Sequence, residues 1–240
     1  MKTTLKLLAE LCKIFINRVF SPAKVFKNRL RLSFGIKPLS ESWGYDRGRP
    51  VHRYYLSQFL HKFREDIHGN CLEFEKDLYA SQYGKERIQK LDILHKETGN
   101  PKATIIADLT KPNEISSNQF DCIICTHVLH HIFDLVKSVS ELYRILKPGG
   151  VLLVAVPHVS MCNPSLHELW RFTPEGLHVL LSKVFGAENV TVYAYGNSLS
   201  TAADFRGLIV NELKKAELEY HDERFAVEVC ARALKQPTKN

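Results

Sequence analysis

The segment that most constrains the fold of this chain runs from Phe120 to Pro157 and reads FDCIICTHVLHHIFDLVKSVSELYRILKPGGVLLVAVP. Residues 122–125 and 150–156 are short, continuous apolar runs, which are typical of strands buried on both faces of a parallel sheet. Between them, apolar residues recur at intervals of three and four, as on a helix that packs against such a sheet. These residues are Leu135, Val139, Leu142 and Leu146. The pattern predicts a βαβ unit with a right-handed crossover.

The same unit predicts where chemistry takes place. The run Lys147-Pro148-Gly149-Gly150 ends the helix, because proline cannot continue it and glycine accepts the left-handed turn into the next strand. Ligands of open parallel sheets bind beyond the carboxyl ends of the strands. Thr126, His127 and His158 follow the two strands directly, so we expect them at a cleft.

Strand and helix patterns alternate along the rest of the chain. Strands are predicted at 70–74, 87–93, 103–107, 190–195 and 225–233, and helices at 51–63 and 202–218. A further helix begins at Pro174, where Thr173 is placed to cap it. Seven strands that alternate with helices predict a doubly wound α/β domain.

The positive charge of the chain is concentrated at its N-terminus. Residues 1–37 contain nine Lys or Arg and one Glu, a net charge of +8, and the remainder has 24 Lys or Arg against 25 Asp or Glu. We therefore divide the chain into a basic N-terminal arm, residues 1–40, and one α/β domain, residues 41–240.

The first part of the arm, residues 3–20, has an apolar seam with charged residues opposite, which predicts an amphipathic helix. Glu10 and Lys13 interrupt any run long enough to span a bilayer, and no small-residue cleavage site follows. These features favour a cytoplasmic protein. Six cysteines without the dense spacing of a disulfide scaffold agree with a reducing compartment, and Cys122 and Cys125 should point to opposite faces of their strand.

Beyond Pro22, basic residues alternate with apolar ones up to residue 37. One interpretation is that residues 1–37 lie on an anionic membrane, peripherally on its inner face, since each basic residue near such a surface contributes about 1 kcal/mol. The alternative is a helix packed on the domain or on a second subunit of a homodimer. Nucleic acid fits less well, because the aromatic residues do not form a separate stacking platform.

The order of elements, the acidic residues Glu73, Asp92 and Asp108, and the runs FDCIICTHVLHHI and ELYRILKPGG together resemble a class I S-adenosylmethionine-dependent methyltransferase. The resemblance covers about residues 65–234. It implies a mostly parallel, seven-stranded, Rossmann-like sheet with an antiparallel last strand. The segments RGRPVHRYY, LWRFTPEGL and VYAYGN further resemble bacterial methyltransferase-like proteins that accompany glycosyltransferases in surface-polysaccharide biosynthesis.

The resemblance implies S-adenosylmethionine as cofactor. It places the methionine part near Glu73, Glu75 and Thr126, the ribose hydroxyls on Asp92 and the adenine near Asp108 and Leu109. Asp92 follows Glu73 by 19 residues, close to the interval of roughly 20 at which nucleotide folds place a ribose-binding carboxylate.

The loop after the first strand departs from the family pattern. The family usually has Glu-x-Gly-x-Gly-x-Gly, whereas this chain reads Glu73-Phe74-Glu75-Lys76-Asp77-Leu78-Tyr79. Glycines there let the backbone approach the ligand. Two hypotheses follow: a variant cofactor site, or a catalytically silent methyltransferase-like binding or scaffold module.

Candidate catalytic residues are His127 and His158, because a histidine can take a proton from an acceptor hydroxyl. The His127-x-x-His130-His131 cluster lacks the closed four-ligand pattern of a zinc site, so no metal is predicted. The substrate would contact two groups of residues, one before the first strand and one after the fifth: Arg47 and Arg49, and Trp170 and Arg171. Such arginines suit phosphates of a nucleotide sugar or lipid-linked saccharide. The predicted reaction is O-methylation of a saccharide or saccharide-linked intermediate.

Overall fold

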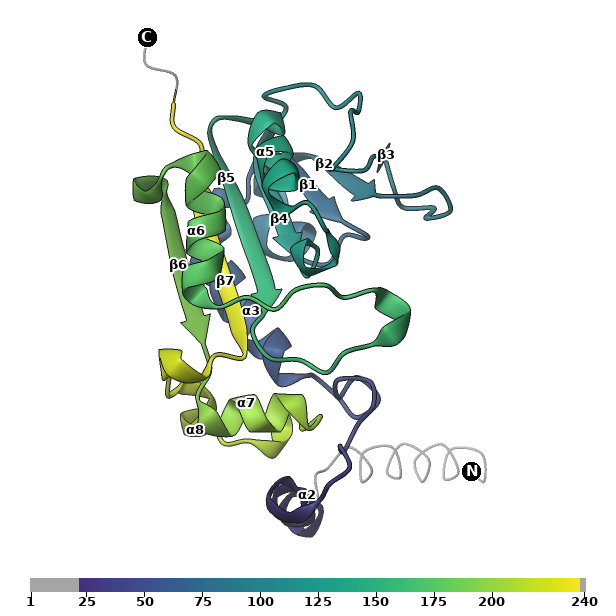
Figure 1. Cartoon of the computed structure of the whole chain (residues 1–240), viewed down its shortest axis with the longest axis vertical. Helices are drawn as coiled ribbons and strands as arrows, with labels where there is room; N and C mark the ends of the chain where they lie inside the picture. The colour runs from purple at the N-terminus through teal and green to yellow at the C-terminus, as the bar shows by residue number, and fades with distance from the viewer. Residues whose placement is uncertain (1–21, 238–240) are drawn as a thin grey trace, which may run out of the picture.

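The computed structural model of the chain describes residues 22–237. Its centre is a seven-stranded sheet in the order β3-β2-β1-β4-β5-β7-β6 (Figure 1). The strands are β1 (Gly69–Phe74), β2 (Ile88–His95), β3 (Ile105–Ile106), β4 (Phe120–Thr126), β5 (Leu146–Pro157), β6 (Val190–Tyr195) and β7 (Glu228–Leu234). The first five pair in parallel, and β7 is antiparallel to both β5 and β6. This confirms the predicted fold.

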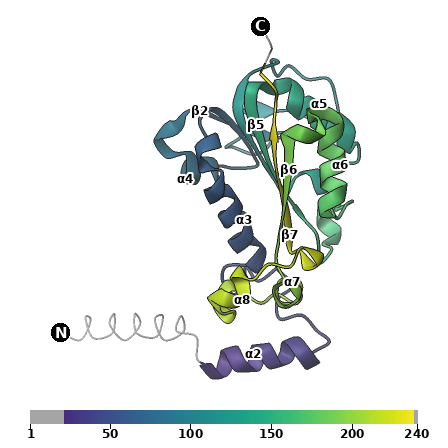
Figure 2. The same ribbon diagram turned by 90° about the vertical axis from the view of Figure 1, so that its left-hand side faces the viewer.

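Helices cover both faces of the sheet (Figure 2). The helices are α2 (Pro22–Phe34), α3 (Val51–Lys62), α4 (Ala80–Gly84), α5 (Leu135–Ile145), α6 (Pro174–Phe185), α7 (Ser198–Phe205) and α8 (Lys215–Glu219). Short 3-10 helices occur at Arg64–Asp66, Lys85–Arg87, Leu129–His131, Pro164–Leu166, Ala187–Asn189, Val210–Glu212 and Glu223–Phe225. Helices α5 and α6 pack on one face of the sheet, and α3 and α4 pack on the other.

The central strands are buried on both faces, as their apolar runs predict. Cys125 belongs to the core beneath α5 and α6, and Cys122 to the core beneath α3, so the two sulfurs lie on opposite faces. Helix α5 ends at Ile145, and Gly149 has the expected left-handed backbone, with φ +82°. The turn forms an irregularity at the start of β5, where the pairing register shifts.

The helix predicted for residues 202–218 is wrong. The structure has two shorter helices, α7 and α8, which are separated by a left-handed glycine, Gly207, with φ +77°. A Cβ atom there would lie 2.7 Å from that of Ser40, so the chain must turn at a glycine. Together α7 and α8 form a third layer with part of α3, beyond the carboxyl end of β5.

Helix α2 is the described part of the arm, and the predicted helix of residues 3–20 lies outside the described residues. Helix α2 packs below α7 and α8 in Figure 2. Asn28 donates to Glu212 Oε1 at 2.6 Å, and Arg29 forms a two-bonded pair with Glu217. Within residues 22–237, no helix is both long and apolar enough to cross a membrane.

Candidate functional site

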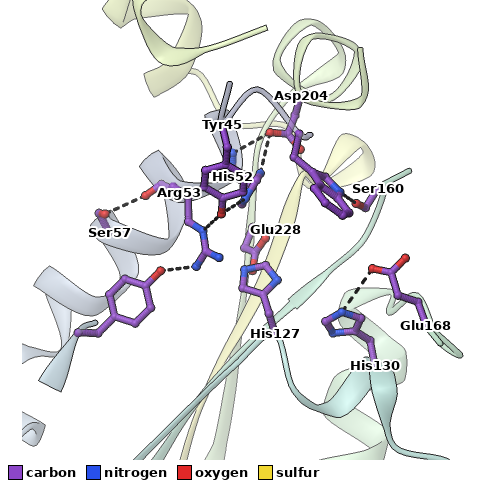
Figure 3. Close-up of polar contacts among 12 residues, drawn as sticks. Tyr45, His52, Arg53, Ser57, His127, His130, Ser160, Glu168, Asp204 and Glu228 are labelled. Atoms are coloured by element: carbon purple, nitrogen blue, oxygen red, sulfur yellow. Dashed lines mark hydrogen bonds and ion pairs between the residues drawn. The ribbon is translucent and has the colours of Figure 1, made fainter. Parts of the chain in front are cut away.

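A cavity of about 210 Å³ lies at the carboxyl ends of β4 and β5, beneath the layer formed by α7. Figure 3 shows its polar side chains, which come from segments far apart in sequence. The lining residues are Trp43, Tyr45, His52, Arg53, His127, His130, His131, Pro157, Val159, Ser160, Leu166, Glu168, Asp204, Val227 and Glu228. This is the edge of the sheet at which the strand pattern predicts a cleft.

Of the site residues predicted from the sequence, His127 lines the cavity. It directly follows β4, its N–H donates to the Ala155 carbonyl at 2.8 Å, and its φ of +54° is unusual for a residue other than glycine. This backbone turn directs the imidazole into the cavity. Burial, together with the positive charge of Arg53, lowers the pKa of His127 well below its ordinary value.

Glu228 lies beside His127 on the cavity floor (Figure 3). It is the first residue of β7, and because β7 is antiparallel, it pairs with Pro157 at the carboxyl end of β5. The side chain is fully buried, and Oε1 lies 3.2 Å from His127 Nε2. Among the described residues, neither carboxylate oxygen has a partner at hydrogen-bond geometry, so the contact with His127 is one of proximity.

The two side chains favour their uncharged forms. Burial raises the pKa of Glu228 well above its ordinary value, although the nearby Arg53 offsets part of this effect. The pKa of His127 is displaced in the opposite direction. Two ionisable groups this close titrate as a unit. At neutral pH the pair therefore holds a proton that it can release or accept within the cavity.

A second histidine–carboxylate pair forms the roof of the cavity. His52, at the start of α3, contacts Asp204 of α7 twice: through its backbone N–H at 2.9 Å and through Nδ1 at 3.0 Å. The rings of His52 and His127 meet edge to face, with centroids 5.7 Å apart. Beside them, Arg53 donates to the hydroxyls of Tyr45 and Tyr79.

The third wall is the segment between β5 and α6. Glu168 in this segment lies 3.6 Å from His130 Nε2 and accepts from Arg171 at 2.9 Å. Burial and the neighbouring His131 lower the pKa of His130 to about 3, so this ring stays neutral. Trp170 donates from its indole nitrogen to the Ile132 carbonyl at 2.8 Å. The two predicted substrate residues, Trp170 and Arg171, thus hold the wall in place.

Other predicted residues lie outside this cavity. His158 is turned away: its Nδ1 contacts the Phe172 carbonyl at 2.8 Å, and the side chain is not part of the lining. Arg47 is bonded to Glu212 and to the Gly207 carbonyl, which makes it a support for the α7–α8 layer. Arg49 lies in a separate groove along α3.

The loop after β1 keeps a tight path without glycine. Glu75 occupies the place of the first family glycine and takes a left-handed conformation, with φ +67°. The buried Glu73 carboxylate accepts from the backbone N–H groups of Leu78, Tyr79 and Ala80 at 2.8–3.2 Å. Burial nevertheless raises the pKa of Glu73 to about 7. Glu73 therefore organises the loop, and its oxygens are already occupied.

The other predicted cofactor residues differ in their availability. Asp92 lies three residues before the end of β2, buried, with Thr104 at 2.9 Å and Lys90 at 2.9 Å as partners. Asp108 is only partly buried and accepts from Thr110, which lowers its pKa. Leu109 is buried next to it, and Thr126 ends β4.

These residues fit an adenosyl group with a charged amino-acid tail. The left-handed Glu75 gives the loop the backbone course that glycine gives elsewhere. Its carboxylate lies 3.3 Å from His95 Nε2 but is largely exposed, so it can also receive an ammonium or hydroxyl group. Asp108 and Leu109 add a carboxylate and an apolar surface at the same edge. Residues 22–237 contain no group of three His, Cys, Asp or Glu side chains arranged to hold a metal ion.

The cavity residues that were not predicted include His52, Glu168, Asp204 and Glu228. One of them carries a signal in the sequence, because Glu228 is a carboxylate inside the apolar run FAVEVCARA of a predicted buried strand. An acid in such a strand needs a local reason. The others come from helices and a loop, and their meeting depends on the tertiary fold.

Comparison with known proteins finds similarity in the central region of the chain. The protein family described as "Methyltransferase domain" matches residues 64–154. The demethylmenaquinone methyltransferase of Leptospira interrogans is 31% identical over 88 residues, which cover 36% of this chain and 32% of that protein. The chain spans about a third or less of the length of the first curated relatives it matches.

Solved structures of methyltransferases share the fold. A SAM-dependent methyltransferase from Archaeoglobus fulgidus superposes with a TM-score of 0.52 at 13% identity, over 76% of this chain and 94% of that one. Phosphoethanolamine N-methyltransferase 2 of Haemonchus contortus, in complex with S-adenosyl-L-methionine, gives 0.50 at 16% identity, over 94% of this chain and 60% of that one. The solved structures confirm the predicted fold, and the family match assigns residues 64–154 of it to a methyltransferase domain.

Proposed function

We propose that this chain, which carries a class I S-adenosylmethionine-dependent methyltransferase domain, methylates a hydroxyl group of a saccharide or saccharide-linked intermediate. The observation that carries the proposal is the His127–Glu228 pair in a cavity at the carboxyl ends of the central strands. A hydroxyl is a weak nucleophile until it loses its proton, and this pair is placed to take that proton. Donors and acceptors around the cavity suit a hydroxyl-rich acceptor.

The cofactor would be held by the loop after β1 and by the residues after β3 and β4. Glu75 would receive the ammonium group, Lys76 the carboxylate, and Asp108 and Leu109 the adenosyl part; Thr126 lies at the end of β4 between the loop and His127. When bound, S-adenosylmethionine supplies a methyl group on a sulfonium. The protein's part is to position the acceptor and to exclude water, which gives a large share of such rates.

His127 and Glu228 would act as one proton acceptor. The pair accepts a proton from the acceptor hydroxyl most readily after it has lost its own, so the reaction should accelerate as pH rises. The edge-on His52 ring confines His127, and Asp204 fixes His52 through two contacts. The contacts of Asp204 with His52, and of His52 with His127, keep the His127 imidazole in a constant position while the acceptor binds.

The proposal is tested by calorimetric titration with S-adenosylmethionine and S-adenosylhomocysteine. We expect both compounds to bind. Glu75→Ala should weaken their binding at least fivefold, because it removes the carboxylate proposed to receive the ammonium group. Glu86→Ala, an exposed glutamate in the next 3-10 helix, is the matched control and should bind as the natural protein does. If neither compound binds at millimolar concentration, the protein is instead a catalytically silent binding module.

The arm gives the proposal a second part, contact with an anionic membrane surface. The polar residues Asn28 and Arg29 of helix α2 face the domain. Its apolar residues face outward, since the exposed fraction is 69% for Phe26 and 49% for Leu30. This reverses the usual orientation of an amphipathic helix. Exposed Lys24 and Lys27 flank the apolar side chains, and the net charge of +8 in residues 1–37 complements anionic lipid.

Sedimentation of the full chain with liposomes containing phosphatidylglycerol tests this surface. We expect Phe26→Ser with Leu30→Ser to reduce sedimentation several-fold, and Val179→Ser, an exposed apolar residue on α6, to leave it unchanged. If the double variant sediments normally but changes the oligomeric state, the face is a contact with a second copy of the chain, and the membrane proposal fails.

A further inference from the structure

A second hollow, outside the His127 cavity, lies along α3 and α4. It has a volume of about 520 Å³ and is more open to solvent than the cavity. The residues that line it are Arg49, Arg53, Tyr54, Ser57, Gln58, His61, Tyr79, Gln82 and Tyr83. We refer to it as the α3–α4 groove. All nine side chains can donate hydrogen bonds, and none is a carboxylate.

The two arginines of the groove form no ion pair among the described residues, although Arg53 lies near the Glu228 carboxyl. Arg53 bonds only to the hydroxyls of Tyr45 and Tyr79, and none of the ion pairs in the described part of the chain involves it. Arg49 contacts the Arg53 carbonyl at 2.9 Å and the Ser57 hydroxyl at 2.6 Å, again without a carboxylate. Two guanidinium groups on adjacent turns of one segment, with neutral partners, favour an anion between them.

The other lining residues suit a sugar. Tyr54 and Tyr79 lie beneath Arg49 and Arg53, with the guanidinium carbons 5.8 and 5.9 Å from the ring centroids. Tyr79 is only 8% exposed, so the ring available to a sugar is that of the half-buried Tyr54. Aromatic faces pack against the apolar side of a pyranose ring, and the amides of Gln58 and Gln82 can bond its hydroxyls. The combination of cation, aromatic face and amide is that of a site for a phosphorylated saccharide.

Arg53 also joins the groove to the cavity, because it lines both hollows. In Figure 3 its guanidinium lies between the α3 side and the His127–Glu228 pair. A ligand whose phosphate lies against Arg49 and Arg53 would extend its sugar hydroxyls past Arg53 toward His127. The groove and the cavity would then bind two parts of one acceptor.

We propose, on the basis of the function proposed above, that the α3–α4 groove binds the phosphate of a glycosyl phosphate and so selects phosphorylated saccharides as acceptors. The phosphate ester can come from a soluble sugar phosphate or from a lipid-linked one. Both sources present the same group to Arg49 and Arg53.

The test is calorimetric titration of the full chain with glucose 1-phosphate, with glucose, and with an alkyl glucosyl phosphate in neutral micelles. We expect one or both phosphates to bind and glucose not to. Arg49→Gln should weaken phosphate binding about tenfold, whereas Arg224→Gln, an exposed arginine paired with Asp222, removes the same charge elsewhere and should have no effect. Stronger binding of the alkyl compound would assign the lipid-linked source.

Three results would overturn the proposal: no binding of either phosphate, equal loss in Arg49→Gln and Arg224→Gln, or displacement of glucose 1-phosphate by S-adenosylhomocysteine. The last would assign the groove to the cofactor. Because cofactor binding is titrated separately, a protein that binds cofactor but no sugar phosphate refutes only the groove. One that binds sugar phosphate but no cofactor refutes only the methyltransferase activity.

Discussion

His127 Nε2 lies 3.2 Å from Glu228 Oε1, and both side chains lack a partner at hydrogen-bond geometry within the described residues. Buried polar groups in native proteins are nearly always satisfied, and exceptions concentrate at functional sites. The arrangement leaves a carboxyl group and an imidazole available to a ligand. It also has consequences for stability that can be measured without knowledge of the acceptor.

Replacement of Glu228 by Gln should stabilise the protein at alkaline pH. Because the pKa of Glu228 is raised in the folded state, stability falls as pH rises from the ordinary carboxyl pKa toward the folded one. The variant lacks this loss, and we expect a free energy of unfolding about 1–3 kcal/mol higher than that of the natural protein at pH 8. Urea unfolding at pH 5 and pH 8 measures the difference, and a variant that is less stable at both values would contradict it.

Replacement of Asp204 by Ala should destabilise the folded protein. This carboxylate accepts from both the backbone and the ring of His52 and joins α7 to α3 across 152 residues of sequence. Its loss leaves two buried donors unpaired, which costs about 2–3 kcal/mol. Thermal unfolding measures the loss. Asp222→Ala, which removes a carboxylate paired with the exposed Arg224, is the control and should lower the unfolding temperature much less.

The Glu73 carboxyl should make folding depend on pH between about 4.5 and 7. Its pKa rises from 4.5 to about 7 on folding, mainly through burial, so the folded protein retains a proton that the unfolded chain releases. Stability is full below that window and falls by about 3 kcal/mol as pH rises through it, at about 1.4 kcal/mol per pKa unit. Glu73→Gln should show a smaller fall in urea unfolding. Equal slopes for the two proteins would refute this assignment.

Local signals predicted much of the fold. Thr173 and Pro174 predict the start of α6, and Thr173 Oγ1 does accept from the Gly176 N–H at 3.0 Å. Such a signal lies within four residues, so it can be read directly from the sequence. The prediction of one helix at 202–218 is wrong because the break at Gly207 depends on a tertiary contact. The apolar pattern continues across Gly207, and the sequence does not show that Ser40 approaches it closely.

The site was less predictable than the fold, because its residues meet only through topology. His127 follows a recognisable strand, and its position at the cavity agrees with that pattern. Glu228 reaches the same edge because β7 runs antiparallel to β5. The apolar pattern of residues 225–233 does not specify strand direction, which only the family resemblance implied. Arg47 illustrates the opposite error: the arginine cluster suggested substrate binding, but one of its members is neutralised by Glu212 from the far end of the chain.

Glu212 should be the carboxylate on which the attachment of the arm depends. It is 1% exposed, and it accepts from Asn28, from Arg47 and from the Ile209 N–H. Glu212→Gln removes the charge opposite Arg47 and leaves that guanidinium unpaired. A broken buried pair costs about 3–5 kcal/mol, and trypsin should also cleave α2 faster at the exposed Lys24 and Lys27, because the helix is held less firmly.

The matched control for this variant is Glu217→Gln, because Glu217 pairs with Arg29 of the same helix but at a more exposed position. A partly exposed pair contributes about 1 kcal/mol or less, so this change should affect urea unfolding and the rate of trypsin cleavage much less than Glu212→Gln does. The contrast separates a buried anchor from a surface contact on one helix. If the two variants lose the same stability, or if cleavage in α2 does not accelerate in Glu212→Gln, the arm is held by its other contacts and Glu212 serves only the α7–α8 layer.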